Sequence, residues 1–224
     1  MRKHSANRPE EPLKLREQAY VGYTNSLLAR EILPGQFITQ RELVEITGLP
    51  LGAIRELIPR LEAEGLIKTV PQRGMQVPQV DLNLVHNAFQ FRIFLEQAAV
   101  EQFTREASDT LINTLQSRHE DIIERVSQGE EDSVLEDAQA TDLALHETII
   151  DHLHNDIISN AYRVNFIKIR LIRQNETRLN SSMVMPAMRE HMSIIEALQR
   201  RDAQAAVQAM VHHIETARKR AVGI

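Results

Sequence analysis

The sequence predicts a mainly α protein built from two parts. In residues 34–77, two short helical patterns lie on either side of Gly48, and a hairpin pattern bounded by turn residues follows them. From residue 82 to residue 222 the periodicity is helical, with Gly129 and Pro186 as the only glycine and proline. The length of 224 residues suits two domains of moderate size. Together these observations predict an N-terminal winged helix-turn-helix and a C-terminal all-α bundle of six helices.

The expected domain boundaries follow from breaks in these patterns. Residues 1–12 are polar and are expected to form a disordered tail. A helix over residues 13–31 then begins the first domain, which spans residues 13–78. A short linker over residues 78–81 leads into the second domain, residues 79–224.

Local signals define the first short helix of the predicted helix-turn-helix. Pro34 and Gly35 mark a turn before it. Thr39 and Glu42 are three residues apart and fit a capping box, in which each side chain binds the backbone amide of the other. Gly48 suits the left-handed conformation that ends many helices.

The second short helix is expected to begin near Pro50, and a hairpin is expected after it. The core stripe of this helix consists of Leu51, Ile54, Leu57, Ile58 and Leu61. Pro59 lies inside the helix, where it removes a backbone donor and is expected to kink the helix or alter its axis. Residues 67–70 and 75–77 are predicted to form two short strands, joined by a tip that carries Arg73.

Composition and charge exclude several classes of protein. The chain has no cysteine, so it has neither a disulfide framework nor thiolate chemistry. No secretory signal and no run of about 18 apolar residues is found, which predicts a cytoplasmic protein without a membrane span. Residues 1–78 contain 11 Lys and Arg against 9 Asp and Glu, a net charge of +2, and residues 79–224 contain 15 against 22, a net charge of −7. A basic head on an acidic body fits a DNA-binding protein, and so weakly basic a head needs two copies for strong affinity.

Three short runs in the first domain carry a family resemblance. They are the Pro-Gly turn at residues 34–35, Leu-Glu-Ala-Glu-Gly-Leu-Ile at 61–67 and Arg-Gly-Met-Gln-Val at 73–77. With these runs, residues 20–78 resemble the DNA-binding domain of the GntR family of bacterial transcription regulators. The resemblance implies DNA contacts from Arg41, Arg55, Arg73 and the backbone of Gly74.

The start of the second short helix departs from that family. A small hydroxyl residue, an arginine and a threonine are usual there, whereas this chain has Pro50, Leu51 and Gly52. By position, Leu51 and Gly52 are still expected to face DNA. Leucine cannot make the bidentate contact that arginine makes with guanine. The operator sequence is therefore expected to differ from the family norm.

Six helices are expected in the second domain. Their ranges are 82–106, 108–128, 132–153, 156–178, 185–200 and 202–221. Asp81, Ser108, Ser133 and Asp202 suit the N-cap position, and Pro186 suits the first turn of the fifth helix. The inward face of the first helix is expected to include Leu95, Ala98, Ala99 and Phe103.

Residue types that bind metals occur on three of these helices. Asp142 and His146 are four residues apart and therefore share one helix face, and His191 and His213 lie on the last two helices. One carboxylate and three imidazoles suit Zn²⁺, with Ni²⁺ or Mn²⁺ as alternatives. Spacing alone also fits an ordinary hydrogen-bonded pair on a helix surface. Three other histidines of the bundle are expected at the surface or at a rim: His86, His119 and His212.

Further matches extend across the second domain. They are Arg92 with Leu95-Glu96, Asp142 and His146, Asn155, Glu190-His191, and Met210 with His213. With them, residues 81–222 resemble the FCD ligand-sensing domain of FadR-type regulators, and six helices instead of seven resembles the VanR-type branch. The resemblance implies that the aspartate and three histidines bind a divalent metal and that Arg92 helps to hold the carboxylate of a small effector. Asn155 is expected either to contact the effector or to cap the following helix.

The function expected from these patterns is a ligand-responsive bacterial transcription regulator, most often a repressor in this family. Two chains pair on a pseudo-palindromic site in double-stranded DNA, and a small carboxylate metabolite bound at the metal and Arg92 releases them. One alternative is a metal-dependent helical-bundle enzyme, although the Glu-x-x-His motif of di-metal bundles is absent from the sequence. The other is an architectural DNA-binding protein that responds to no ligand.

Overall fold

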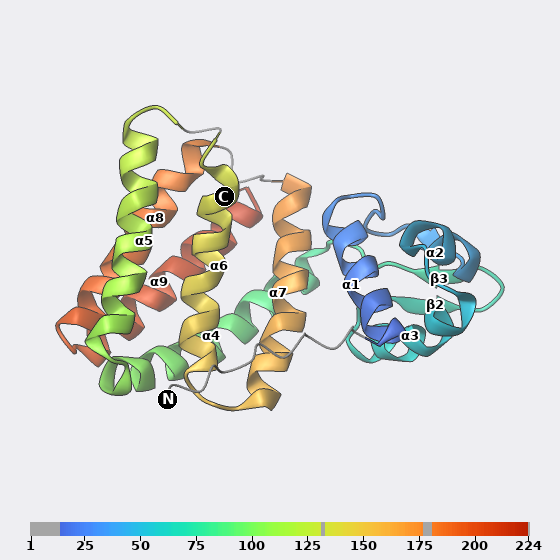
Figure 1. Ribbon diagram of the computed structural model, residues 1–224, viewed down its shortest axis with the longest axis horizontal. Coiled ribbons are helices and arrows are strands. Elements are labelled where there is room, and N and C mark those ends of the chain that lie inside the picture. Colours follow the sequence, from blue (N-terminus) through green and yellow to red (C-terminus); the bar gives the residue numbers. More distant parts are fainter. Residues whose placement is uncertain (1–13, 131–132, 177–180, 224) are drawn as a thin grey trace, which may run out of the picture. The chain divides into compact units, whose positions relative to one another are not determined.

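The computed structural model describes residues 14–130, 133–176 and 181–223 (Figure 1). The chain divides after Gln79 into two compact units, called unit 1 and unit 2 below. The described residues form nine helices and three short strands, which confirms the predicted mainly α fold. None of these helices is long and apolar enough to cross a membrane. The expected tail, residues 1–12, lies outside the described residues.

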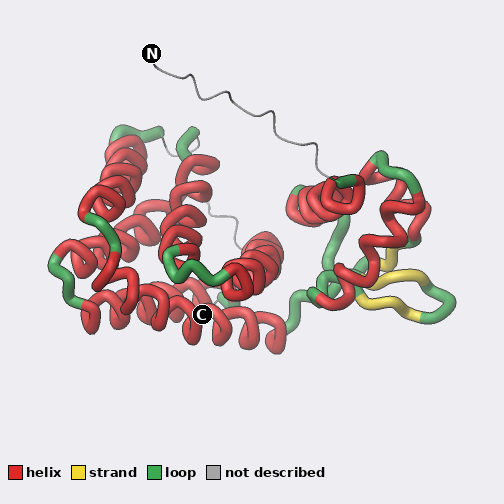
Figure 2. Tube along the Cα trace, turned by 60° about the horizontal axis from the view of Figure 1, so that its bottom comes forward, coloured by secondary structure: helices red, strands yellow, loops and turns green. Residues whose placement is uncertain are grey.

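Unit 1 is a small helical domain with a three-stranded sheet. Its elements are α1 (Leu15–Leu28), β1 (Phe37–Ile38), α2 (Gln40–Thr47), α3 (Leu51–Ala63), β2 (Lys68–Val70) and β3 (Gly74–Gln76). The strands, yellow in Figure 2, are antiparallel in the order β1-β3-β2, with Ile38 opposite Met75 and Val70 opposite Gly74. The predicted hairpin is therefore present. The sequence did not indicate β1, because a strand of two residues is too short to show an alternating pattern.

The helix-turn-helix forms through the local signals expected for it. The backbone amide of Glu42 donates to Thr39 Oγ1 over 3.2 Å and the amide of Thr39 donates to Glu42 Oε2 over 2.7 Å, which confirms the capping box. Gly48 ends α2 with a φ of 68°. Helix α3 continues through Pro59. The prediction that Leu51 lies in the core stripe is wrong: as the first residue of α3 it is 39% exposed.

Unit 2 contains six helices in its described residues, as predicted. They are α4 (Leu82–Glu106), α5 (Asp109–Ser127), α6 (Leu135–Asp151), α7 (Asp156–Glu176), α8 (Ser181–Gln199) and α9 (Ala203–Ala221). Asp81, Ser108 and Asp202 accept N-cap hydrogen bonds as expected. Ser133 does not, because α6 begins two residues later and the Ser133 hydroxyl donates to the Glu130 carbonyl. Pro186 lies inside α8 and not in its first turn.

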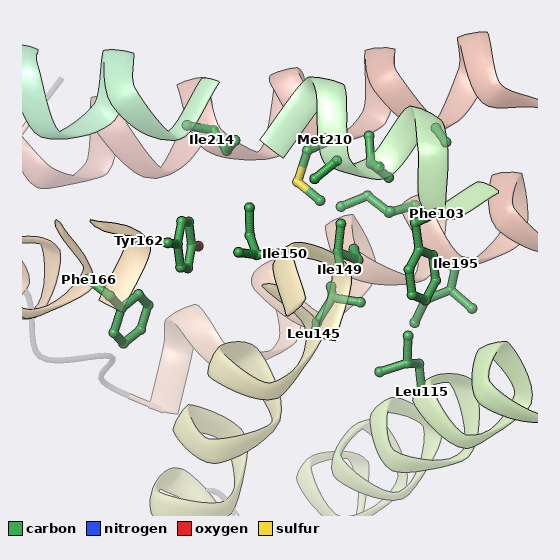
Figure 3. Packing of buried hydrophobic residues seen from close by; sticks show 14 of the residues in the cluster. Phe103, Leu115, Leu145, Ile149, Ile150, Tyr162, Phe166, Ile195, Met210 and Ile214 are labelled. Carbon is green, nitrogen blue, oxygen red and sulfur yellow. The ribbon is translucent and has the colours of Figure 1, made fainter. Parts of the chain in front are cut away.

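Two apolar clusters fill the bundle, and a layer of polar side chains lies between them. The first cluster is the larger and includes Phe103, Leu115, Leu145 and Ile195 (Figure 3). The second cluster consists of Ile122, Val126, Val134, Ala138, Val184 and Met188. Three helices pass from the first cluster to the second through a polar residue: Leu115, His119 and Ile122 on α5, Leu145, Asp142 and Ala138 on α6, and Ile194, His191 and Met188 on α8. We define the polar layer as the buried residues Arg92, Glu96, His119, Asp142, His146, His191 and His213.

Helix α4 contributes two charged residues to this layer, which changes its expected inward face. Glu96 is buried, whereas Ala98 is exposed. The expectation that Ala98 faces the interior is therefore wrong. The inward face of α4 instead carries Arg92 and Glu96, whose side chains pair with each other inside the bundle.

Candidate metal centre

The four predicted metal ligands meet at one point in the polar layer. Asp142 and His146 come from α6, His191 from α8 and His213 from α9, and one ligand atom from each lies within 4.8 Å of the others. The Nε2 atom of His191 is 3.2 Å from His213 Nε2 and 3.6 Å from Asp142 Oδ1. Ligands about 2.0–2.1 Å from a tetrahedral Zn²⁺ are about 3.3 Å apart. The spacing of these atoms therefore suits a single ion.

Each of the three histidines has a hydrogen-bond partner on its Nδ1 atom. His146 Nδ1 is 2.5 Å from Glu96 Oε2, His191 Nδ1 is 3.1 Å from His119 Nε2, and His213 Nδ1 is 2.8 Å from Glu190 Oε2. Ligating histidines usually bind such an outer partner with one ring nitrogen and the metal with the other. The Nε2 atoms then face the centre of the group, although that of His146 also contacts Arg92 Nη2 over 3.1 Å, so the donor set and its supports fit a divalent metal once this contact is released.

The protonation state of the rings also suits metal binding. Burial lowers the pKa of His191 well below its usual value, and neighbouring His213 lowers it further. Burial has the same effect on the pKa of His213, with His146 adding to it. Both rings are therefore neutral, and only a neutral imidazole offers a lone pair to a metal.

A buried ion pair lies beside the four ligands. Arg92 Nε donates to Glu96 Oε1 over 2.6 Å, and the hydroxyl of Tyr162 donates to the same oxygen over 2.9 Å. Burial opposes the charge of Glu96, but Arg92 and His146 outweigh it and hold its pKa well below the usual range. Arg92 also places its Nη2 atom 3.1 Å from His146 Nε2. The arginine predicted to bind an effector carboxylate thus borders the metal ligands, with its Nε edge already held by Glu96.

The structure corrects the prediction for His119 and bears on the two alternatives for Asn155. His119 was expected at the surface, but it is fully buried in the polar layer. The helical spacing of Ile112, Leu115, Ile122 and Val126 could have indicated this, because His119 continues their stripe. Asn155 is exposed, and its side-chain oxygen accepts the backbone amides of Ile157 and Ile158, so it caps α7. The contacts of Asn155 thus match the capping alternative and include no residue of the polar layer. His86 and His212 are exposed, as expected.

The predicted DNA-binding residues lie in unit 1, and most of them are exposed. The exposed residues are Arg41, Leu51, Gly52, Arg55 and Arg73. Arg41 also forms an ion pair with Glu45. Gly74 has a structural reason to be glycine: its φ is 90°, and a Cβ atom there would lie 2.9 Å from the carbonyl oxygen of Ile38 in β1. Gly52 has no neighbour within 4 Å of a built Cβ, so packing does not require a glycine at that position.

Comparison with known proteins gives two family matches. Residues 87–216 match the FCD domain family, which is more than half of the chain. Residues 36–68 match a family described as winged helix-turn-helix DNA-binding.

Relatives and solved structures agree with these matches. The uncharacterized HTH-type transcriptional regulator YdhC of Bacillus subtilis (strain 168) is 26% identical over 185 residues, which are 80% of this chain and 79% of YdhC. The HTH-type transcriptional repressor RspR of Escherichia coli (strain K12) is 24% identical over 215 residues, 92% of this chain and 88% of RspR. Among solved structures, E. coli McbR/YncC has a TM-score of 0.73 at 15% identity, covering 92% of this chain and 95% of that one. The metal-free FCD domain of TM0439 has a TM-score of 0.51 at 19% identity, covering 64% and 95%.

Proposed function

This chain belongs to the FCD domain family and is a DNA-binding transcription regulator of the GntR type, and we propose that a divalent metal and a small carboxylate effector in unit 2 control its binding to operator DNA. The observation that carries the proposal is the buried group of Asp142, His146, His191 and His213 with Arg92 beside it. The relatives are named as transcription regulators and the chain is not an enzyme.

The proposed metal is Zn²⁺, with Ni²⁺ or Mn²⁺ as alternatives, because three imidazoles and one carboxylate are the donors. When bound, the ion supplies a positive charge and a coordination position for an effector oxygen. The outer partners Glu96, His119 and Glu190 hold the three rings in the orientation that binding requires. Arg92 Nη2 must leave His146 Nε2 for that atom to act as a ligand.

The charges around the ligands support a carboxylate as the effector. Asp142, Glu96 and Glu190 are three acidic groups, and Arg92 and Arg220 are the two basic groups that pair with the last two of them. With all five ionised, the set has one net negative charge, and a divalent ion changes it to one net positive charge. A single carboxylate then neutralises the set, which is favourable in a buried site. Arg92 Nη2, which contacts His146 Nε2 over 3.1 Å and Glu96 Oε2 over 3.5 Å, would turn from His146 to this anion when the metal binds.

A groove beside the bundle is the proposed entry point of the effector. It has a volume of about 830 Å³, lies along α5 and α6 and is lined by polar residues that include Ser117, Arg118 and Thr141. Thr141 is adjacent in sequence to the ligand Asp142. Arg118 gives the groove a positive side chain that can attract an anion, and the effector would have to pass inward from there, because Asp142 does not line the groove.

On DNA, the proposed unit of function is a homodimer. Two heads of residues 13–78 would bind the half-sites of one operator, and the domains of residues 79–224 would pair and sense the ligand. The proposed sign of regulation is repression relieved by the effector, which is supported by the description of the relative RspR as a repressor. The effector can drive release only through a difference in its affinity for the bound and free arrangements. The proposed location is the cytoplasm, where the operator lies.

A gel-shift experiment tests this proposal. Zn²⁺-loaded protein is bound to operator DNA and challenged with a panel of small carboxylates, beside the double variant His146→Ala/His213→Ala. We expect one carboxylate to release the wild-type protein, and we expect the double variant to lose its metal in elemental analysis, to bind DNA and to ignore that carboxylate. Unchanged metal content in the double variant refutes the metal site. Turnover of the carboxylate would support an enzyme instead, and no effect of any carboxylate would support an architectural protein.

A further inference from the structure

His119 is a buried histidine of the polar layer that is not among the four proposed ligands. Its side chain is fully buried on α5. Its Nδ1 atom lies 2.7 Å from the carbonyl oxygen of Leu115, and its Nε2 atom lies 3.1 Å from Nδ1 of His191. Both ring nitrogens therefore have a partner, and one of these partners is a proposed metal ligand.

The Leu115 carbonyl, His119 and His191 form a series of hydrogen bonds, and the positions of its protons follow from the carbonyl group. A carbonyl oxygen can only accept, so His119 Nδ1 must carry the proton of that hydrogen bond. A neutral imidazole with a proton on Nδ1 has an acceptor on Nε2. The contact with His191 is then a hydrogen bond only if His191 Nδ1 carries a proton. In a neutral ring this leaves the lone pair of His191 on Nε2, the atom that faces His213 and Asp142.

We propose that His119 is a positioning residue, which fixes the tautomer and ring orientation of His191 so that the Nε2 lone pair faces the other metal ligands. The Leu115 carbonyl sets the direction of these hydrogen bonds, and α5 thereby supports the site without supplying a ligand. The role in metal binding rests on the proposed metal site, but the tautomer of His191 does not.

The outer partner of His191 differs from those of the other two histidines. Glu96 and Glu190 are carboxylates, which only accept hydrogen bonds when ionised, so each favours a proton on the Nδ1 atom that it faces. His119 adds no negative charge while it is neutral, so it orients His191 without changing the net charge of the set described above. A carboxylate in its place would cancel the positive charge that the ion leaves for the effector.

Two variants separate a positioning role from simple packing. In His119→Gln the amide oxygen can accept from His191 Nδ1 and the amide nitrogen can donate to the Leu115 carbonyl, so both hydrogen bonds can be kept. In His119→Leu the shape is filled by an apolar group and both hydrogen bonds are lost. Far-UV circular dichroism of both variants checks that the bundle is folded.

The first measurement is the ring ¹⁵N spectrum of the full-length, metal-free protein, with the His191 signals identified from a His191→Gln variant. We expect a proton on Nδ1 of His191 in the wild type and in His119→Gln, and a mixture of tautomers in His119→Leu. The second measurement is Zn²⁺ affinity, for which we expect a loss of about 10- to 100-fold in His119→Leu and near-wild-type binding in His119→Gln.

A proton on Nε2 of His191 in the wild type overturns the proposal. So does a folded His119→Leu variant with the wild-type tautomer and wild-type Zn²⁺ affinity. If the wild type binds no Zn²⁺, the proposed metal site fails, and the ¹⁵N spectrum of the metal-free protein still decides whether His119 positions His191.

Discussion

The buried pair of Arg92 and Glu96 allows a sharp prediction about stability. Substitution Glu96→Gln removes the carboxylate and keeps its size. The Arg92 guanidinium then stays in the interior, where its side chain is 3% exposed, without the anion that it binds at 2.6 Å. The amide that replaces the carboxylate keeps only one acceptor oxygen, so either Arg92 Nε or His146 Nδ1 faces a donor instead of the acceptor that it needs.

The expected cost follows from this burial. Breaking a buried ion pair by removal of one partner costs about 3–5 kcal/mol, because the remaining charge is left uncompensated. Helix α4 contains a matched control, since Arg105 and Glu101 form a pair with the same spacing of four residues, with side chains 65% and 47% exposed. An exposed pair of this kind contributes about 0.3–0.5 kcal/mol. Glu101→Gln is therefore expected to change the free energy of unfolding about tenfold less than Glu96→Gln.

Urea denaturation of the full-length protein, followed by circular dichroism at 222 nm, measures both changes in the same experiment. Because the chain has two units, the transition of unit 2 is the one to compare. A third variant, Arg92→Met/Glu96→Met, removes both charges together and is expected to recover most of the lost stability. It should also abolish the response to the carboxylate effector, since Arg92 is absent. Equal costs for Glu96→Gln and Glu101→Gln would refute the reasoning that the pair in the polar layer is desolvated.

Three further predictions concern single positions. Arg55→Ala is expected to weaken operator binding roughly 10- to 100-fold in fluorescence anisotropy, because an exposed arginine of α3 would be lost from the groove contacts; unchanged affinity would remove Arg55 from the interface. Gly74→Ala is expected to destabilise unit 1 by about 1–3 kcal/mol in urea denaturation, because its Cβ meets the Ile38 carbonyl at 2.9 Å and its φ is 90°; a stability equal to wild type would contradict this. Asn155→Ala is expected to cost about 1 kcal/mol through the loss of the α7 cap and to leave the effector response intact; a lost response at wild-type stability would return Asn155 to the effector site.

Elements with a local chemical signal could be predicted from the sequence. The capping box of Thr39 and Glu42 and the left-handed Gly48 involve neighbours in sequence, so their geometry follows from residue identity. Pro186 misled the prediction of the start of α8. A proline favours a first turn, but α8 begins at Ser181 and includes Val184, which is fully buried in the second apolar cluster. Tertiary packing thus extends the helix beyond its local signal.

The candidate site was predictable only in part for a similar reason. Asp142 and His146 share a face through helix geometry, so their proximity follows from spacing. The burial of His119 depends on His191 of α8, and that of Glu96 depends on His146 of α6 in addition to Arg92 on its own helix. Without those partners a buried histidine or carboxylate is unfavourable, and sequence reasoning placed His119 at the surface. Its place in an apolar stripe of α5 was the signal that could have corrected this.

Native mass spectrometry of the full-length protein, exchanged into volatile buffer after exposure to excess Zn²⁺, tests the metal centre most directly. We expect a dimer that retains one Zn²⁺ per chain, and a mass without zinc for the His146→Ala/His213→Ala variant. A wild-type protein that emerges folded but free of zinc, or a variant that retains as much zinc as the wild type, would contradict the assignment of these side chains.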